Sequence, residues 1–444
     1  MSKLRLAIVG AGPAGIYAAD LLIKSELRDF DVSIDLFDLL PAPYGLVRYG
    51  VAPDHPRIKG IIRALYEVLD RGDIRFFGNV QYGKDITLDE LKQHYNAVIF
   101  ATGAVKDADL NIPGIDLEGS FGAAEFVNWY DAHPDFARTW PLNAKEVAVI
   151  GNGNVALDVA RVLAKLPEQM LATDIPANVY EGLKASPVTD VHVFGRRGPA
   201  QVKFSPLELR EATHIEGVDC IVYDEDFQYD DASREAIDSN NQTRVMVNTL
   251  EALREEPQNT GASRRLHLHF FSSPVEVIGV DGKVAALKIE RTKLDGKGGV
   301  VGTGEFRELP VQAVYRAVGY FGSELPEVAY DAKHGVIPND GGRVAPGVYA
   351  TGWIKRGPVG LIGHTKSDAL ETITNLINDK ATWWQPTAPA EQAVVELLES
   401  RGVEYVGWPE WLKIDAHEVA LGEAEGRERI KLVEREDFLR VAKS

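Results

Sequence analysis

The stretch that decides the fold is Leu4-Arg5-Leu6-Ala7-Ile8-Val9, followed at once by Gly10-Ala11-Gly12-Pro13-Ala14-Gly15. The first half is an apolar run that predicts a buried strand, and the second half is a glycine-rich turn. Residues 16–24 then carry good helix formers with apolar spacing, and residues 32–37 alternate between apolar and polar side chains and end at Asp38. This order predicts a βαβ unit, in which a crossover helix joins two parallel strands.

The spacing of the three glycines predicts a dinucleotide site. Gly10 permits the tight turn, Gly12 lets a pyrophosphate approach the backbone, and Gly15 lets the helix pack closely on the strand. The start of the helix offers free N–H groups and the positive end of its dipole to the phosphates. Asp38, at the end of the second strand, can accept hydrogen bonds from ribose hydroxyls. An acidic residue at this position suits FAD.

A second unit of the same kind follows later in the chain. Residues 146–150 predict a strand, residues 151–156 (Gly-Asn-Gly-Asn-Val-Ala) the turn, and residues 157–166 the helix. The next strand, residues 191–194, ends in Gly195-Arg196-Arg197-Gly198 rather than in an acid. Guanidinium groups bind phosphate through charge-assisted hydrogen bonds, whereas a carboxylate would repel a 2′-phosphate. The second unit is therefore predicted to bind NADP(H).

Two further strands indicate how the units are connected. Residues 98–103 and residues 348–352 are both apolar strands that end in Ala-Thr-Gly, and they bracket the second unit. Such a pair is expected when the chain leaves one sheet and later returns to it. We therefore expect an α/β protein with two Rossmann-like dinucleotide-binding domains, in which the NADP domain is inserted into the FAD domain.

The expected domain boundaries follow from these strands. The FAD-binding domain comprises residues 1–104 and 325–444, and the NADP-binding domain comprises residues 105–324. The polar stretch 224–265 is expected on the surface of the inserted domain. From about residue 383 we expect a helical tail, attached to the first domain as a solvated appendage.

The composition excludes several classes of protein. The chain has 66 acidic and 48 basic residues, and a net charge of −18 argues against general binding of nucleic acid. The single cysteine, Cys220, cannot form an internal disulfide, a dithiol redox pair or a four-cysteine cluster. The longest apolar stretches are strand-sized, so no membrane span is expected. The N-terminus enters a strand too soon for a signal peptide, so we expect a cytoplasmic protein. The sequence predicts no metal site.

Ordered strings spread over most of the chain carry a family resemblance. They are residues 40–48 (LPAPYGLVR), 50–56 (GVAPDHP), 151–158 (GNGNVALD), 195–199 (GRRGP), 207–211 (LELRE) and 352–358 (GWIKRGP). These strings closely resemble those of adrenodoxin reductase. The chain is similar to the adrenodoxin-reductase-like branch of ferredoxin–NADP⁺ reductases, which includes bacterial members.

The resemblance implies contacts for both cofactors. Together with the glycines of the first turn (Gly10, Gly12 and Gly15), the implied FAD contacts are Ala14, Asp38, Leu46, Val80, Trp353, Gly360, Leu361 and Ile362. The implied NADP contacts are Asn152, Gly153, Asn154, Val155, Arg196, Arg197, Glu208 and Gly360. Three positions depart from the family pattern. Asp38 stands where glutamate is usual, Tyr44 replaces a common tryptophan, and His364 lies in a segment that differs beside the flavin.

His55 and Glu211 match the pair that the family places near the contact between nicotinamide and flavin. Hydride transfer between stacked rings needs close approach more than an acid or a base. We therefore expect the pair to orient the nicotinamide and to manage a proton or a local charge. On the residues alone, His55 also fits a hydrogen-bonded loop residue, and Glu211 also fits a solvated acid of a charged helix. Cys220 is most simply a buried small side chain.

These observations predict an FAD-containing ferredoxin–NADP⁺ reductase. Such an enzyme takes a hydride from NADPH onto FAD and passes single electrons to a ferredoxin-type iron–sulfur protein. Because ferredoxins are usually acidic, docking is expected on a local basic face, with Arg210, Lys355 and Arg356 as candidates. Two alternatives stay open: an FAD- and NADPH-dependent monooxygenase, and a flavin- and NADPH-binding redox sensor with little turnover. Disulfide reductases are excluded because they need a dithiol.

Overall fold

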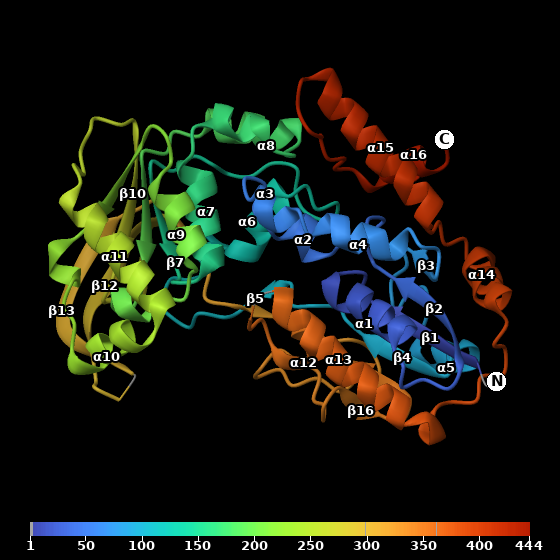
Figure 1. Cartoon of the computed structure of the whole chain (residues 1–444). Coiled ribbons are helices and arrows are strands. Elements are labelled where there is room, and N and C mark those ends of the chain that lie inside the picture. Colours follow the sequence, from blue (N-terminus) through green and yellow to red (C-terminus); the bar gives the residue numbers. More distant parts are fainter. Residues whose placement is uncertain (1–2, 298, 361) are drawn as a thin grey trace.

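The computed structural model describes residues 3–297, 299–360 and 362–444 (Figure 1). It has two six-stranded sheets, a three-stranded antiparallel sheet and a two-stranded one. In Figure 1 the second six-stranded sheet and its helices lie on the left, and the first sheet and its helices lie on the right. The C-terminal helices run along the upper right.

The first sheet has the strand order β16-β17-β4-β1-β2-β3. Its strands are β1 (Lys3–Val9), β2 (Asp31–Phe37), β3 (Ile74–Phe77), β4 (Ala97–Phe100), β16 (Arg343–Ala345) and β17 (Val348–Ala350). All pairs are parallel except that of β16 with β17. β4 is buried along its whole length, as expected of a parallel strand covered on both faces.

Helices cover both faces of the first sheet. One face packs against α1 (Pro13–Lys24), α4 (Ile62–Leu69) and α13 (Ile362–Asn378), and the other against α5 (Leu88–His94) and α14 (Glu391–Ser400). Because β17 pairs with β4, strands from both ends of the chain complete one sheet.

The second sheet is parallel throughout, with the order β6-β14-β7-β8-β10-β9. Its strands are β6 (Ser120–Gly122), β7 (Glu146–Ile150), β8 (Asp190–Phe194), β9 (Val218–Val222), β10 (Arg264–His269) and β14 (Ala313–Arg316). One face packs against α6 (Ala123–Tyr130), α7 (Asn154–Ala164), α9 (Pro206–Thr213) and α11 (Asn241–Glu255). Part of the other face is covered by the antiparallel sheet of β11 (Ser272–Val280), β12 (Lys283–Leu294) and β13 (Val300–Pro310).

The remaining elements are short connections and the tail. They are α2 (Leu46–Tyr49), α3 (Pro56–Lys59), α8 (Ala177–Ala185), α10 (Asp231–Ser239), α12 (Trp353–Arg356), α15 (Trp408–Ala424), α16 (Arg435–Ala442), β5 (Lys106–Asp107), β15 (Tyr320–Phe321), and four 3₁₀ turns at Pro167–Ala172, Pro199–Gln201, Asp224–Asp226 and Lys380–Thr382. Within the described residues, no helix combines the length and the apolar character needed to cross a membrane.

The predicted α/β fold, with one nucleotide-binding unit inserted into another, is confirmed. The whole second sheet is formed by residues that lie between β4 and β16 in the sequence. Both crossover helices begin three residues before their predicted starts, at Pro13 and at Asn154. The reason is that the last residues of each glycine-rich turn already adopt the first helical turn.

The expectation that residues 224–265 lie on the surface is wrong for α11. Met246, Leu250 and Leu253 are buried in the core of the second sheet. Their spacing places them on one face of the helix, and the polar residues between them face solvent. The high polar content of the stretch concealed this apolar stripe.

The tail is not a solvated appendage. Trp411 and Ile414 of α15 and Phe438 of α16 are buried and belong to the same core as the first sheet. Lys431, between the two helices, is only 1% exposed and forms an ion pair with Asp131 of the inserted part. The tail therefore joins the two halves of the molecule.

Candidate functional site

The turn between β1 and α1 has the geometry that its glycines predict. Gly10 has a φ of +113°, and a Cβ there would lie 2.4 Å from the carbonyl oxygen of Ala101. A Cβ on Gly15 would lie 2.0 Å from the carbonyl oxygen of Gly10. At Gly12 a Cβ would meet only the Cα of Gly45, at 3.7 Å. Gly12 also begins the helix without a side-chain cap, so the first N–H groups of α1 stay available to an anion.

Asp38 holds this turn in shape. Its Oδ2 accepts a hydrogen bond from the backbone N–H of Ala11 at 2.7 Å, and its Oδ1 accepts one from Leu40 at 2.8 Å. Burial raises the pKa of Asp38 to about 6, although these two hydrogen bonds oppose the rise. Each oxygen keeps a second lone pair, so the carboxyl group can still accept a hydrogen bond from a ribose hydroxyl.

Other residues expected to contact FAD gather around this turn. Val80 is buried, and its N–H donates to the carbonyl oxygen of Asp38 at 2.9 Å. Gly45, whose Cβ would lie 2.9 Å from the Cα of Gly12, brings Leu46 and the start of α2 over the turn. A Cβ on Gly352, the residue before Trp353, would lie 2.6 Å from the Cβ of Ala14.

The expected FAD contacts at the start of α13 are only partly described. Gly360 is exposed and has a φ of +87°, and α13 begins at Ile362. Leu361 lies outside the described residues. Tyr44, one of the departures from the family pattern, is buried and packs edge-on against Trp411 of the tail, with ring centroids 6.0 Å apart. His364, another departure, is exposed near Gly360.

The second turn repeats the first with its own variations. Gly151 has a φ of +154°, and a Cβ there would lie 2.2 Å from the carbonyl oxygen of Ala317. A Cβ on Gly153 would meet no atom within 4 Å. α7 also begins without a side-chain cap, so N–H groups of its first turn, including that of Val155, are available to a phosphate.

Asparagines of this turn support the neighbouring segment before α9. The side-chain Oδ1 of Asn154 accepts a hydrogen bond from the N–H of Ser205 at 2.8 Å, and the carbonyl oxygen of Asn152 accepts one from Lys203 at 2.9 Å. Ser205 in turn caps α9 by accepting from the N–H of Glu208. The turn that should receive the pyrophosphate therefore fixes the helix that carries Glu208.

Arg196 and Arg197 follow β8, at the carboxyl end of the second sheet. Their backbone is held from two sides: the hydroxyl of Thr292 donates to the carbonyl oxygen of Arg196 at 2.7 Å, and the N–H of Phe271 donates to that of Arg197 at 3.1 Å. The side chain of Arg196 is exposed, and the buried Nε of Arg197 has no protein partner. An unpaired buried N–H is costly, so this guanidinium fits an anionic ligand.

His55 is completely buried between two glutamates of α9. Its Nε2 lies 2.7 Å from Oε1 of Glu208, and its Nδ1 lies 2.8 Å from Oε2 of Glu211. The contact with Glu211 has the distance of an ion pair but not the direction of a hydrogen bond, because neither atom meets the angular requirements. Burial lowers the pKa of His55, but its hydrogen bond to Glu208 and the charges of both glutamates outweigh burial, so the pKa is raised overall.

The sequence reasoning missed the side chain that organises this site. Arg161 of α7 is 1% exposed, and its Nε and Nη2 donate to both carboxylate oxygens of Asp54 at 2.7 and 2.9 Å. Nη2 also donates to Asp158 at 2.7 Å, and Nη1 lies 3.5 Å from Oε2 of Glu208. Because Asp54 precedes His55, Arg161 fixes both His55 and its partner Glu208. The sequence shows an arginine in the helix after a glycine-rich turn, but its burial and its pairing with Asp54 are visible only in the folded chain.

Asp158 has the most perturbed carboxyl group near this pair. Burial raises its pKa to about 7, against the effect of the Arg161 charge, and the charges of Glu208 and Asp54 raise it further. A cavity of about 490 Å³ opens beside the network and is lined by Asp54, Glu211 and eight other residues. Solvent and small molecules therefore have access to the Glu211 side of the site.

One small apolar cluster lies between Trp353 and the second turn. Trp353, expected over the flavin, and Val155, expected at the NADP turn, both pack against buried Ala104, Ala124 and Tyr320. Two residues expected on opposite sides of the ring contact therefore pack against the same cluster.

Of the three docking residues predicted from the sequence, the prediction for Lys355 is wrong. Its side chain is 6% exposed, and its Nζ lies 2.9 Å from Asp368 and 2.6 Å from Glu371. Lysine ammonium groups in such positions are neutralised inside the protein and offer no charge to a partner. Arg210 is exposed and Arg356 is half-buried, so both can still face a partner.

Cys220 is half-buried, and burial raises its pKa to about 12. Its thiol is therefore protonated at neutral pH and is a poor nucleophile. The sequence holds no second cysteine with which it can pair.

Comparisons with known proteins agree with this geometry. A family model described as pyridine nucleotide-disulphide oxidoreductase matches residues 4–179. The NADPH-ferredoxin reductase FprA of Mycobacterium tuberculosis is 42% identical, with 99% of each chain covered. The mitochondrial NADPH:adrenodoxin oxidoreductase of Arabidopsis thaliana is 37% identical, over 99% of this chain and 95% of that protein.

The solved structure of Mycobacterium tuberculosis FprA in complex with NADPH superimposes with a TM-score of 0.93 at 40% identity, and all of both chains is covered. Identity at this level over the full length, together with the shared fold, defines membership of a family. The chain belongs to the family of NADPH–ferredoxin and NADPH–adrenodoxin reductases.

Proposed function

We propose that this protein is an FAD-dependent NADPH:ferredoxin oxidoreductase. The observation that carries the proposal is the pair of helix starts without side-chain caps, α1 beside Asp38 and α7 in the unit that ends in two arginines. FAD, when bound, accepts a hydride from NADPH and returns the two electrons one at a time to an iron–sulfur protein. The membership of the chain in the reductase family supports this assignment.

The residues around the first turn fit FAD. The open space at Gly12 and the free N–H groups at the start of α1 are expected to receive its pyrophosphate. Asp38 is expected to bind the ribose while it holds the turn. Ala14, Gly15, Leu46, Val80 and Trp353 enclose the flavin side, and Gly10 shapes the turn. Gly360 and Ile362, at the start of α13, close the set of proposed contacts.

The residues around the second turn fit NADP(H). The open space at Gly153 and the N–H groups of Asn154 and Val155 are expected to receive the pyrophosphate. Arg196 and Arg197 are expected to bind the 2′-phosphate, with the unpaired Nε of Arg197 as one donor.

His55, Glu208 and Glu211 form the proposed unit beside the nicotinamide. The imidazole is held between two carboxylates, which fix its orientation, and the hydrogen bond to Glu208 and the charges of both glutamates raise its pKa. We propose that this unit orients the nicotinamide and that Glu211, which borders the cavity, exchanges protons with solvent. Glu208 acts on His55 by accepting its hydrogen bond. The sequence predicted Glu208 as an NADP contact and did not predict its pairing with His55.

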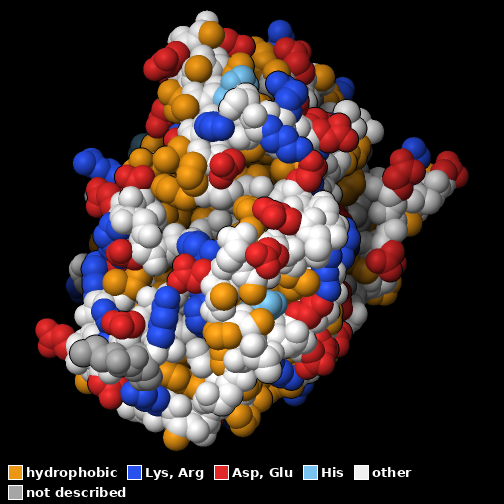
Figure 2. All heavy atoms as spheres, turned by 90° about the vertical axis from the view of Figure 1, so that its right-hand side faces the viewer, with side chains coloured by type: hydrophobic (Ala, Val, Ile, Leu, Met, Phe, Trp, Pro, Cys, Tyr) orange, Lys and Arg blue, Asp and Glu red, His pale blue; other side chains and the backbone are white. Residues whose placement is uncertain are grey.

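The partner is proposed to be an acidic ferredoxin that docks on Arg210 and Arg356. Figure 2 shows acidic and basic side chains interspersed on the side where α14 and the N-terminus lie in Figure 1, so that side offers no concentrated positive charge. Where charge pairs speed the association of two proteins, the association rate falls with salt, because ions screen the attraction between the charges. The rate of ferredoxin reduction is therefore expected to fall steeply with ionic strength.

Reduction of cytochrome c by NADPH, measured with and without added ferredoxin, tests the function. Stimulation by ferredoxin is the expected result. NADPH oxidation that consumes oxygen without ferredoxin stimulation would instead indicate a monooxygenase. Rapid flavin reduction followed by slow electron release to every acceptor would indicate a sensor.

We further propose that the FAD-binding domain comprises residues 1–104 and 325–444, and that the NADP-binding domain comprises residues 105–324. The division of the strands between the two large sheets supports these boundaries. The proposed compartment is the cytoplasm, because NADPH and a reducible ferredoxin must both reach the enzyme. Cell fractionation tests this assignment.

A further inference from the structure

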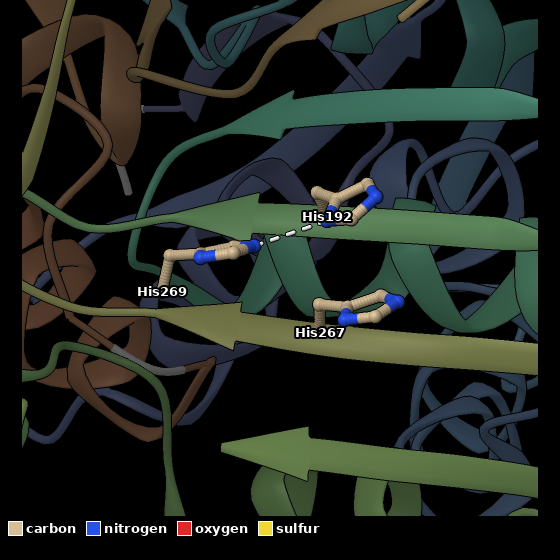
Figure 3. Close-up of side chains that lie close together, drawn as sticks. All are labelled: His192, His267 and His269. Carbon is tan, nitrogen blue, oxygen red and sulfur yellow. Dashed lines mark hydrogen bonds between the residues drawn. The ribbon is translucent and has the colours of Figure 1, made fainter. Parts of the chain in front are cut away.

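Three histidines lie together on one face of the second sheet (Figure 3). His192 is on β8, and His267 and His269 are on β10, where His267 lies directly opposite His192 in the parallel register. Residues at i and i+2 of a strand point to the same face of the sheet, so both histidines of β10 lie on the face that carries His192. Nδ1 of His192 lies 3.0 Å from Nε2 of His269. One nitrogen from each ring lies within 4.8 Å of the others.

The far nitrogens of two of these rings are held by carboxylates. Nε2 of His192 lies 2.9 Å from Oε2 of Glu146, and Nε2 of His267 lies 2.9 Å from Oδ1 of Asp190. A carboxylate partner makes Nε2 the protonated nitrogen and leaves a lone pair on Nδ1, which is the arrangement found behind histidine ligands of metals. The Nδ1 atoms therefore carry the lone pairs, and in the metal-free protein these accept from His269 and from the Tyr223 hydroxyl, so an ion would replace these two hydrogen bonds.

The third ring is held by stacking. The His269 ring lies between those of Phe194 and Tyr223, with centroids 4.6 and 4.7 Å away and interplanar angles of 9° and 20°. The hydroxyl of Tyr223 also lies 2.9 Å from Nδ1 of His267, which brings an oxygen to the same place. Rigid side chains held by second partners are the usual basis of a binding site.

The charges at the cluster suit a cation. Glu146 and Asp190 place two carboxylates behind the rings, and Glu146, Asp190 and His192 lie close enough to one another to share an ion. Arg265, Arg291 and Arg307 are positive groups near the cluster. Each is paired with a carboxylate (Asp190, Asp226 and Glu225, in that order), which offsets its charge. His269 is half-buried, which leaves a route to solvent.

We propose that His192, His267 and His269 bind a divalent transition-metal ion of the zinc class. The ligands are Nδ1 of His192, Nδ1 of His267 and Nε2 of His269, and water takes the fourth position. In the metal-free protein the three rings lie nearly parallel, with interplanar angles of 17°, 29° and 14°, so binding turns them toward the shared ion. On binding, the proton on Nε2 of His269 exchanges through solvent for one on Nδ1, so the ring stays neutral and its contact with His192 is replaced by the ion. Glu146 and Asp190 orient the ligands without touching the ion.

Equilibrium dialysis of the FAD-loaded enzyme against Zn²⁺, with the bound metal counted per chain, tests this site. The H192Q and H269Q variants are expected to lose one equivalent of zinc. E146Q, which alters only an orienting group, is expected to weaken zinc binding about 10- to 100-fold. H334Q is the matched control, because His334 is exposed and pairs with Asp331 rather than with the three histidines. This variant should keep the full equivalent of zinc. E211Q should also keep it, which separates this site from the His55, Glu208 and Glu211 group.

Zinc content unchanged in both H192Q and H269Q would overturn the proposal, as would loss of the same equivalent in E211Q. NADPH oxidation by the H192Q enzyme should match that of the wild type, which also shows that the variant is folded. If H192Q does not fold, anomalous scattering at the zinc edge from wild-type crystals grown with Zn²⁺ decides the question. A peak among the three rings supports the site, and peaks only elsewhere reject it.

Discussion

Arg196 and Arg197 are the residues expected to distinguish NADPH from NADH. Replacing both by alanine removes the guanidinium groups proposed for the 2′-phosphate, including the unpaired buried Nε of Arg197. A hydrogen bond to a charged group contributes about 1.5–3 kcal/mol, so kcat/KM for NADPH should fall about 10- to 100-fold. The value for NADH should stay the same. R234A, at an exposed arginine of α10, is the control, and equal losses with both nucleotides would contradict the phosphate role.

The charge of His55 provides a second test at the level of single residues. The folded enzyme raises the pKa of His55, so the protonated form is stabilised below the unfolded pKa and this stabilisation is lost as the pH rises through the folded pKa. E211Q removes one of the two negative charges and should lower the pKa of His55. The basic limb of the kcat profile should therefore move to lower pH. E216Q, at an exposed glutamate bordering the same cavity, should leave the profile unchanged. An unshifted E211Q profile would show that Glu211 does not set this charge.

Much of the candidate site was predictable from single residues because its residues lie in short, continuous stretches of the sequence. The spacing of Gly10, Gly12 and Gly15 required no knowledge of distant residues. Arg161 was missed because its importance depends on Asp54, which is far away in the sequence and becomes its partner only in the folded chain. The three-histidine cluster was missed for the same reason, although the alternation of His267 and His269 on one strand was visible.

At the scale of elements, the starts of α1 and α7 should act independently. A Cβ fits at both Gly12 and Gly153 without a clash and without a positive φ, so G12A and G153A should both fold. Each methyl group, however, takes the space proposed for a pyrophosphate, and overpacking of this kind costs about 1–3 kcal/mol. G12A should therefore lose FAD affinity, whereas G153A should keep FAD and raise the KM for NADPH about 5- to 150-fold.

The flavin content of each purified variant and its KM for NADPH separate these effects. G15A is the contrasting variant, because its Cβ would lie 2.0 Å from the carbonyl oxygen of Gly10 and should destabilise the fold itself. If G153A lost FAD, or if G12A retained full FAD affinity, the assignment of one cofactor to each helix would be wrong.

Elements dominated by local patterns were predicted well, and elements defined by long-range packing were not. The βαβ units follow from glycine spacing and apolar runs that lie close together in the sequence, over residues 3–37 and 146–194. α11 was placed on the surface because its polar residues outnumber the apolar stripe of Met246, Leu250 and Leu253. The tail was misjudged because Trp411 and Phe438 find their core partners in β-strands and helices that begin the chain.

At the scale of the whole molecule, a buried charge cluster ties the tail to both halves. Nζ of Lys431 lies 3.0 Å from Oδ1 of Asp131 and 3.3 Å from Asp174, and it also donates to the carbonyl oxygen of Arg48 at 2.9 Å. Lys59 joins the same two aspartates at 3.4 and 3.0 Å. Two lysines thus balance two aspartates where the first sheet's segment, the inserted part and the tail meet. Removing one charge leaves a buried carboxylate with an incomplete set of partners.

K431M should therefore lower the free energy of unfolding by about 3–5 kcal/mol, the usual cost of breaking a buried ion pair from one side. K443M is the matched control in the same tail, because Lys443 and its partner Glu404 are exposed and such pairs contribute about 0–1 kcal/mol. Adding D131N to K431M should restore part of the loss, since the amide no longer carries an unbalanced buried charge. Thermal unfolding followed by flavin fluorescence compares the three variants. If K431M unfolds at the temperature of K443M, or if D131N worsens the loss, the cluster does not hold the tail through its charges.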